Sequence, residues 1–219
     1  MSNTLFLRLE GPLQAWGERA RWSVRDTSTE PTKSGVVGLL GCALGLTADE
    51  DLVDLSRGLR MGVRCDKEGI FMTDFHTIVG GVLSAEGKVK SDTVLSKRSY
   101  LCDASFLVAL QGSSDLIERL ALAVQRPTWP FYLGRRACVP ARPVYEGVGE
   151  HADLVTALRE WPCQCDLLAG SDGLRTVLEV EPGRGVQRRD ETLSNQYRTF
   201  LPRYTLEQRI MPAEPREVV

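Results

Sequence analysis

The sequence predicts an α+β protein with a ferredoxin-like βαββαβ domain, a protruding β-hairpin and a smaller, mostly β C-terminal lobe. The first observation is the order of segments in the N-terminal part, which reads strand, helix, strand, strand, helix and matches most of a ferredoxin-like unit. The second is a polar, glycine-containing segment at about residues 80–98, and the third is a weaker pattern after Pro143. We therefore expect one domain at residues 1–142, with the hairpin at about 80–98, and a second at residues 143–219.

The sequence begins with a predicted strand and continues to a predicted helix that is rich in glycine. Residues 4–9 have the composition of a strand, which Gly11 and Pro12 end. Residues 31–46 then form a predicted helix with glycines at positions 35, 38, 41 and 45. Each interior glycine costs roughly 1 kcal/mol relative to alanine, so the helix backbone must be needed at close range. Simple packing is one explanation, since Gly38, Gly41 and Gly45 have a spacing that would let the helix press against a sheet.

The start of this helix favours an anion. Thr32, Lys33, Ser34 and Gly35 place unpaired N–H groups, a hydroxyl and an ammonium at the positive end of the helix dipole. A nucleotide-binding P-loop would have glycine directly before the Lys-Ser pair and another five residues further back. Those positions hold Thr32 and Thr27. We therefore expect a phosphate cradle here, but not one that hydrolyses ATP or GTP.

The remaining elements of the first domain follow from periodicity and capping. A short acidic helix is predicted near residues 49–56, and a strand at 59–65. The clearest strand is at Ser99–Leu110, where apolar side chains alternate with the polar Asp103 and Ser105. Ser113 then caps an amphipathic helix that ends before Pro127.

The segment Gly80–Arg98 is predicted to be a long hairpin that stands off the sheet. Its glycines and its polarity are not those of a core element. Its basic residues could reach a neighbouring subunit or a nucleic acid; they are Lys88, Lys90, Lys97 and Arg98. An ordinary solvated hairpin is the alternative. In the C-terminal lobe, a helix at about 153–161 and a strand at 176–180 are recognisable.

The charge distribution points to a nucleic-acid groove. A formal net charge of −2 argues against a protein that coats nucleic acid indiscriminately. However, residues 126–142 hold four arginines and no acid, and residues 184–209 hold six arginines against three acids. Aromatic residues are interleaved with both stretches, which is typical of a groove that follows a phosphate backbone and stacks bases. A charge run can also be a solvated face.

The sequence predicts a cytoplasmic protein with no membrane partner, no metal and no cofactor. No segment approaches the ~20 apolar residues of a membrane span, and the N-terminus lacks the basic start and cleavage site of a signal peptide. Cys163 and Cys165 form only C-x-C, with no second pair at ligand spacing and two histidines in the chain.

Six short motifs, occurring together and in order, carry a family resemblance. They are RLEGPLQAWG at 8–17, PTKSG at 31–35, VRCD at 63–66, DFHT at 74–77, YLCDASF at 100–106 and YLGRR at 132–136. Over about residues 4–145, the chain resembles the type I-E members of CRISPR-associated protein family five, which are subunits of the Cascade surveillance complex.

The resemblance implies an RRM-like RNA-binding fold, with a protruding thumb and a smaller second domain. It also implies a non-catalytic role in antiviral defence, in which the protein binds and caps the 5′ handle of the CRISPR RNA. The implied partners are that RNA, the neighbouring backbone subunit, which the thumb contacts, and the large subunit. Target DNA would be met only through the complex.

A fixed RNA end can be held by phosphate contacts, stacked bases and hydrogen bonds. We assign the phosphate to Lys33, Ser34 and the Gly35 amide. A stacking surface is assigned to Tyr132 or Trp16, although both could instead be core aromatics, and Gln14 is assigned as a hydrogen-bonding reader. Arg135 and Arg136 would contact the backbone or a base edge. Because adjacent residues of an extended segment point in opposite directions, one arginine would touch RNA and the other would pair with an acid.

Two other functions remain open from the sequence. Type I-C relatives cleave precursor RNA, and a metal-independent endoribonuclease would need a base, an acid and a cation, for which His76, Tyr100 and Lys97 are available. However, His76 lies in the apolar run 75–79, which is typical of a hydrogen-bonded structural histidine. The second alternative is a purely structural connector whose basic surface meets acidic protein partners.

Overall fold

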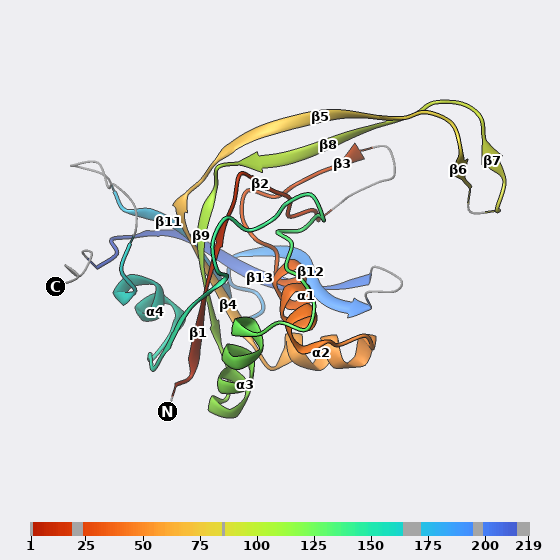
Figure 1. The fold of residues 1–219 in the computed structure, drawn as a ribbon. Coiled ribbons are helices and arrows are strands. Elements are labelled where there is room, and N and C mark those ends of the chain that lie inside the picture. Colours follow the sequence, from red (N-terminus) through yellow and green to blue (C-terminus); the bar gives the residue numbers. More distant parts are fainter. Residues whose placement is uncertain (1, 19–23, 85, 164–171, 195–198, 214–219) are drawn as a thin grey trace.

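The computed structural model describes residues 2–18, 24–84, 86–163, 172–194 and 199–213 (Figure 1). The structure is mixed α+β, as the sequence predicts, and its sheets are mostly antiparallel. Its elements in chain order are β1 (Thr4–Glu10), β2 (Leu13–Gln14), β3 (Val24–Arg25), α1 (Lys33–Leu44), α2 (Asp49–Arg57), β4 (Arg60–Lys67), β5 (Ile70–Ile78), β6 (Val82–Leu83), β7 (Val89–Lys90), β8 (Val94–Cys102), β9 (Ser105–Gln111), α3 (Ser114–Gln125), β10 (Tyr145–Gly149), α4 (Leu154–Glu160), β11 (Leu174–Val180), β12 (Val186–Ser194) and β13 (Thr199–Ile210).

The main sheet has seven strands in the order β10-β1-β9-β4-β11-β13-β12, and all its pairings are antiparallel. The chain passes from β1 through α1 and α2 to β4, and from β9 through α3 to β10. Each connection therefore crosses one intervening strand. The helices α1 and α3 of these two connections pack against the same face of the sheet, where they lie beside each other.

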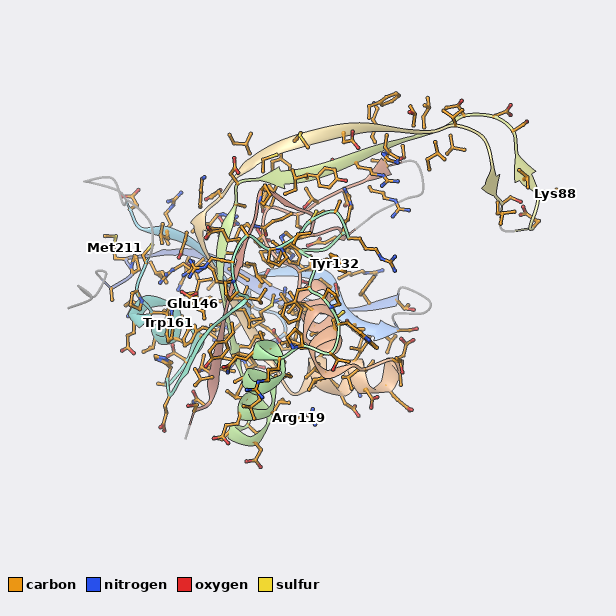
Figure 2. The ribbon with its side chains drawn as sticks, in the orientation of Figure 1. Lys88, Arg119, Tyr132, Glu146, Trp161 and Met211 are labelled. Atoms are coloured by element: carbon orange, nitrogen blue, oxygen red, sulfur yellow. The ribbon has the colours of Figure 1, made fainter. Side chains whose placement is uncertain are left out.

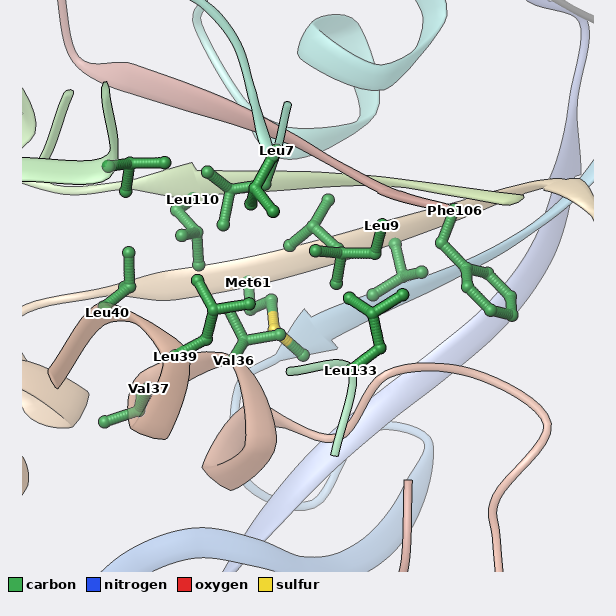
Figure 3. Close-up of a cluster of buried hydrophobic side chains, with 14 of the residues drawn as sticks. Leu7, Leu9, Val36, Val37, Leu39, Leu40, Met61, Phe106, Leu110 and Leu133 are labelled. Carbon is green, nitrogen blue, oxygen red and sulfur yellow. The ribbon is translucent and has the colours of Figure 1, made fainter. Parts of the chain in front are cut away.

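The larger core lies between this sheet and the helices α1, α2 and α3 (Figures 1 and 3). Along β1, Leu5, Leu7 and Leu9 point into this core at a period of two. They meet Val36 and Leu40 of α1, which are fully buried. The residues between them on β1 point to the opposite face of the sheet.

That opposite face is covered by α4 (Figure 1). Phe6 stacks on Trp161, with ring centroids 4.0 Å apart. Beside this cluster Arg8 and Arg64 are both buried against Asp66, at 2.6 Å each. Arg64 also donates hydrogen bonds to the carbonyl groups of residues 158, 161 and 162, which ties the end of α4 to β4.

The predicted hairpin is present, but it is longer than residues 80–98. β5 and β8 pair from Ile70 opposite Cys102 to Ile78 opposite Val94, and β6 pairs with β7 near the tip. The hairpin projects well beyond the main sheet (Figure 1). At its base β8 also pairs with β2 and, in parallel, with β3.

The predicted single strand at Ser99–Leu110 is wrong, because the chain breaks there into β8 and β9. Asp103 has a φ of 54°, and the chain passes at this point from the hairpin sheet to the main sheet. Aspartate tolerates this left-handed conformation better than most residues. β9 is buried on both faces, since Phe106 lies in the larger core and Leu107 in the α4 core.

The strands after Pro143 hydrogen-bond into the same sheet as the N-terminal strands. β10 forms one edge beside β1, and β11 joins β13 and β12 to β4. The division into domains at residues 142 and 143 stays a prediction. None of the helices that the structure describes is long and apolar enough to cross a membrane.

We predict that Arg64→Ala lowers the free energy of unfolding by about 3–5 kcal/mol, because three carbonyl groups lose their donor and buried Asp66 loses one of its two arginine partners. Urea unfolding would measure this. The control is Arg60→Ala, an exposed change on the same strand that should stay within about 0.5 kcal/mol. Equal effects of the two variants would contradict the structural role of Arg64.

Candidate nucleic-acid interface

A cavity of about 700 Å³ lies where the start of α1 faces the base of the hairpin. Figure 2 shows Tyr132 between the β5–β8 hairpin and α1. Seven of the residues singled out from the sequence line this cavity; they are Trp16, Ser34, Gly35, Arg98, Tyr132, Arg135 and Arg136. Segments that are distant in the sequence thus form one site.

One wall of the cavity is strongly cationic. Among the described residues, the cavity is lined by one acid, Asp26, and by four arginines, which are Arg25, Arg98, Arg135 and Arg136. Arg25 of β3 lies directly opposite Arg98 of β8, so both project from the same face of the hairpin sheet. Such a concentration of positive charge in a concave site attracts a polyanion.

The adjacent arginines both line the cavity but have different partners, and among the described residues neither pairs with an acid, as one of them was predicted to do. Arg135 donates hydrogen bonds to the carbonyl oxygens of Ser99, Arg25 and Asp26 at 3.0–3.1 Å. Its guanidinium also lies 4.6 Å from the ring centroid of Tyr100. Arg136 is exposed and has no hydrogen-bond or ion-pair partner among the described residues. Arg135 therefore fixes the wall, while Arg136 is available for a ligand.

The opposite wall is the glycine-rich face of α1. Thr32 caps the helix by accepting a hydrogen bond from the Gly35 N–H, at 3.3 Å. Ser34, Gly35 and Gly38 face the cavity. The packing explanation holds for Gly41, where an added Cβ would lie 2.5 Å from Leu52 of α2, and Gly45 ends the helix with a φ of 72°. At Gly38 an added Cβ would meet nothing within 4 Å.

Lys33 has other partners than the predicted phosphate. Its side chain is 2% exposed and lies 2.9 Å from Glu179 and 3.6 Å from Glu191. Its backbone N–H donates to the carboxylate of Asp190 at 2.9 Å. The cradle expected at Lys33 is therefore filled by acids from β11 and β12. The assignment of the Gly35 amide to phosphate is also wrong, because this N–H is bonded to Thr32, although Ser34 and Gly35 both face the cavity.

Asp190 is itself held by Arg203, whose guanidinium donates two hydrogen bonds to it at 2.9 and 2.6 Å. Burial disfavours the charged carboxylate, but these bonds and that from Lys33 N–H outweigh it. The pKa of Asp190 is therefore lowered. The carboxylate remains charged at the helix start, where the dipole also favours it.

Gln14 is a structural residue rather than an open reader of bases. It is fully buried; its amide donates to the carbonyl groups of Leu9 and Ala104 and accepts from the Trp16 indole. Trp16 is 1% exposed, so the core alternative is correct for most of its surface, although it contributes to the cavity floor. Tyr132 is 38% exposed and can offer its ring to a ligand.

The basic residues of the hairpin do not gather at one place. Arg98 faces the cavity, and Lys97 projects from the opposite face of β8 into solvent. Lys88 lies near the tip (Figure 2), and Lys90 lies in β7.

The three residues considered for RNA cleavage do not converge. His76 pairs with Ser96, four positions along β8 from Tyr100, a separation of about 13 Å. Lys97 lies on the opposite face. His76 is not a core histidine either, since its side chain is 42% exposed and 3.7 Å from Asp74. Among the described residues there is no group of His, Cys, Asp and Glu that could hold a metal ion.

Comparison with known proteins decides the family. A model of CRISPR-associated protein (Cas_Cas5) matches residues 4–213. The chain belongs to this Cas5 family. The CRISPR system Cascade subunit CasD of Escherichia coli (strain K12) is 38% identical over 171 residues, covering 72% of this chain and 76% of CasD.

Two solved structures share the fold of this Cas5 family member along nearly its whole length. A crystal structure of a Cas protein has a TM-score of 0.74 at 38% identity, and covers 97% of this chain and 100% of that one. A chain of a CRISPR RNA-guided surveillance complex has a TM-score of 0.75 at 30% identity, with 98% and 95% covered.

Sequence reasoning missed two further parts of the Cas5 site. Thr192 and Phe200 line the cavity from β12 and β13, where no motif drew attention to them. Arg25 of β3 also lines it and lies in none of the six motifs. Arg188 of β12 makes ion pairs with both Glu18 and Glu30.

We predict that Lys33→Ala lowers the free energy of unfolding by at least about 2 kcal/mol, because two glutamates lose their shared cation. Thermal or urea unfolding would measure it. Ser34→Ala, at the half-exposed next position, is the control and should have little effect. Unchanged stability of Lys33→Ala together with lost RNA binding would show instead that the ammonium acts on RNA.

We predict that Asp190→Asn destabilises the protein at neutral pH and that this difference shrinks in acid. The folded-state pKa lies below the ordinary value of 3.8, so the carboxylate contributes stability above that value. The contribution is lost as the pH falls through the lowered pKa. Urea unfolding across pH would measure it, and a difference that stays constant down to about pH 2 would contradict it.

Proposed function

We propose that this chain is a non-catalytic subunit of a type I-E Cascade complex, in which it binds and caps the 5′ handle of the CRISPR RNA for antiviral defence. One observation carries the proposal: beside the glycine face of α1, an arginine-lined cavity of about 700 Å³ contains an exposed tyrosine and Arg136, which has no partner among the described residues. The likeness to CasD, a Cascade subunit by name, supports the same assignment.

The roles within the site follow from which groups are free. Arg136 and Arg98 contact phosphate, because they face the cavity and carry the charge that a backbone oxygen needs. Tyr132 stacks on a base. The Ser34 hydroxyl and N–H are available as hydrogen-bond donors, since neither has a partner in the part of the chain that the structure describes. Lys33, Gln14 and Arg135 position these groups rather than touch RNA.

The hairpin serves as the thumb that contacts the neighbouring backbone subunit. Its outer face exposes large apolar side chains that a free protein would not be expected to keep in water; they are Phe71, Phe75, Val79 and Leu95. Lys97 lies among them, opposite Phe75 in the ladder. The large subunit and, through the complex, target DNA are the further partners.

The strand order β10-β1-β9-β4 with α1 and α3 supports a ferredoxin-like unit at the centre of the fold. Within residues 143–219, β10 completes this unit, and the smaller lobe then extends the sheet beyond β4 through β11, β13 and β12. We place the protein in the cytoplasm. A nuclease role is less well supported, because the residues it would use lie apart.

The test is charge reversal at Arg136 and Arg98 in the assembled complex. We predict that the double variant with Arg136→Glu and Arg98→Glu weakens CRISPR RNA binding and reduces the slope of log affinity against log salt by about 2, one for each lost phosphate contact. Arg119→Glu is the matched control, because Arg119 is exposed on α3 and lies away from the cavity (Figure 2).

Binding and salt dependence that match the control would contradict the proposal. Specific cleavage of repeat RNA by the purified chain in EDTA, lost in His76→Ala, would favour the nuclease instead.

A further inference from the structure

The two walls of the cavity differ in the chemistry that they offer. The arginines project from β3, β8 and the segment 131–136, on one side. On the other side, α1 contributes Ser34, Gly35 and Gly38, with the apolar Val37 and Leu39. Along the middle of a helix, N–H and C=O groups are already paired with each other. This wall therefore provides few donors for a phosphate, but at Gly38 it leaves open space next to the helix backbone.

Gly38 has no packing role among the residues that the structure describes. The other helix glycines do: Gly35 fits beneath Trp16, Gly41 beside Leu52, and Gly45 ends the helix. At Gly38 a Cβ would project into open space, and this position lines the cavity. Glycine in a helix interior destabilises it relative to alanine. A reason outside the folded chain is therefore needed, and close approach of a ligand to the backbone is one that glycine permits.

We propose that the helix wall at Gly38 seats one unstacked nucleobase of the bound RNA, with its sugar and phosphate turned toward the arginine wall. This inference rests on the proposed RNA-binding function. A base suits this wall, because its flat face needs no hydrogen bond and its edge can reach the Ser34 hydroxyl. The exposed ring of Tyr132 lines the same cavity and can stack on the base. A seat of this kind selects for a flat ligand more than for a particular base.

The test uses Gly38→Ala and Gly38→Leu in the assembled complex, with Gly41→Ala as the control glycine. Gly38→Ala should raise the melting temperature by about 2–4 °C, because alanine favours the helix and the cavity has room for its methyl group. Gly38→Leu should fill the seat and weaken RNA binding about tenfold or more. Gly41→Ala should leave RNA affinity unchanged.

A set of RNAs that each lack one base of the 5′ handle identifies the part of the ligand concerned. We expect one RNA of the set to bind the wild type more weakly than the complete handle does. That same RNA should bind the Gly38→Leu variant as tightly as it binds the wild type. Equal weakening of every RNA in the set by Gly38→Leu would overturn the base assignment in favour of a backbone contact. Normal binding of every RNA by Gly38→Leu, with binding lost in the Arg136 and Arg98 variant, would overturn the seat alone. Normal binding by both variants would overturn the proposed function itself.

Discussion

The start of α1 depends on a buried charge cluster whose parts come from opposite ends of the chain. Lys33 contributes one ammonium, and β11 and β12 contribute the carboxylates of Glu179, Asp190 and Glu191. Arg203 completes the cluster from β13. Ion pairs this far from water stabilise a structure only when their geometry and hydrogen bonds are nearly complete. The C-terminal strands thereby fix the helix that forms one wall of the cavity.

Arginines of β11 and β12 also pair with two acids of the N-terminal part of the chain, Glu18 and Glu30. Arg188 joins Glu18 to Glu30, and burial of Glu30 is outweighed by this cation, so the pKa of Glu30 is lowered. Arg175 adds a second contact to Glu30. Arg135, bonded to three carbonyl groups, adds a third set of contacts that hold the cavity wall in place without a ligand. Such preorganisation lowers the entropy lost on binding.

Local patterns predicted most elements, including α1 and α3 with its Ser113 cap. They also predicted several cavity residues, because arginine next to an aromatic side chain is a local signal. They could not predict the partners of Lys33, which lie at least 146 residues away in the sequence. The break at Asp103 was missed because apolar alternation continues across it. The exposure of His76 was missed because the apolar run 75–79 suits a buried strand as well as an exposed one.

The most direct measurement of the central claim is photocrosslinking from position 132, with a photoreactive phenylalanine analogue in place of Tyr132 in the assembled complex. The account predicts a crosslink to the 5′ handle of the CRISPR RNA, and none from the same analogue at Leu122, an exposed position on α3. A handle that crosslinks from Leu122 but not from position 132 would contradict it.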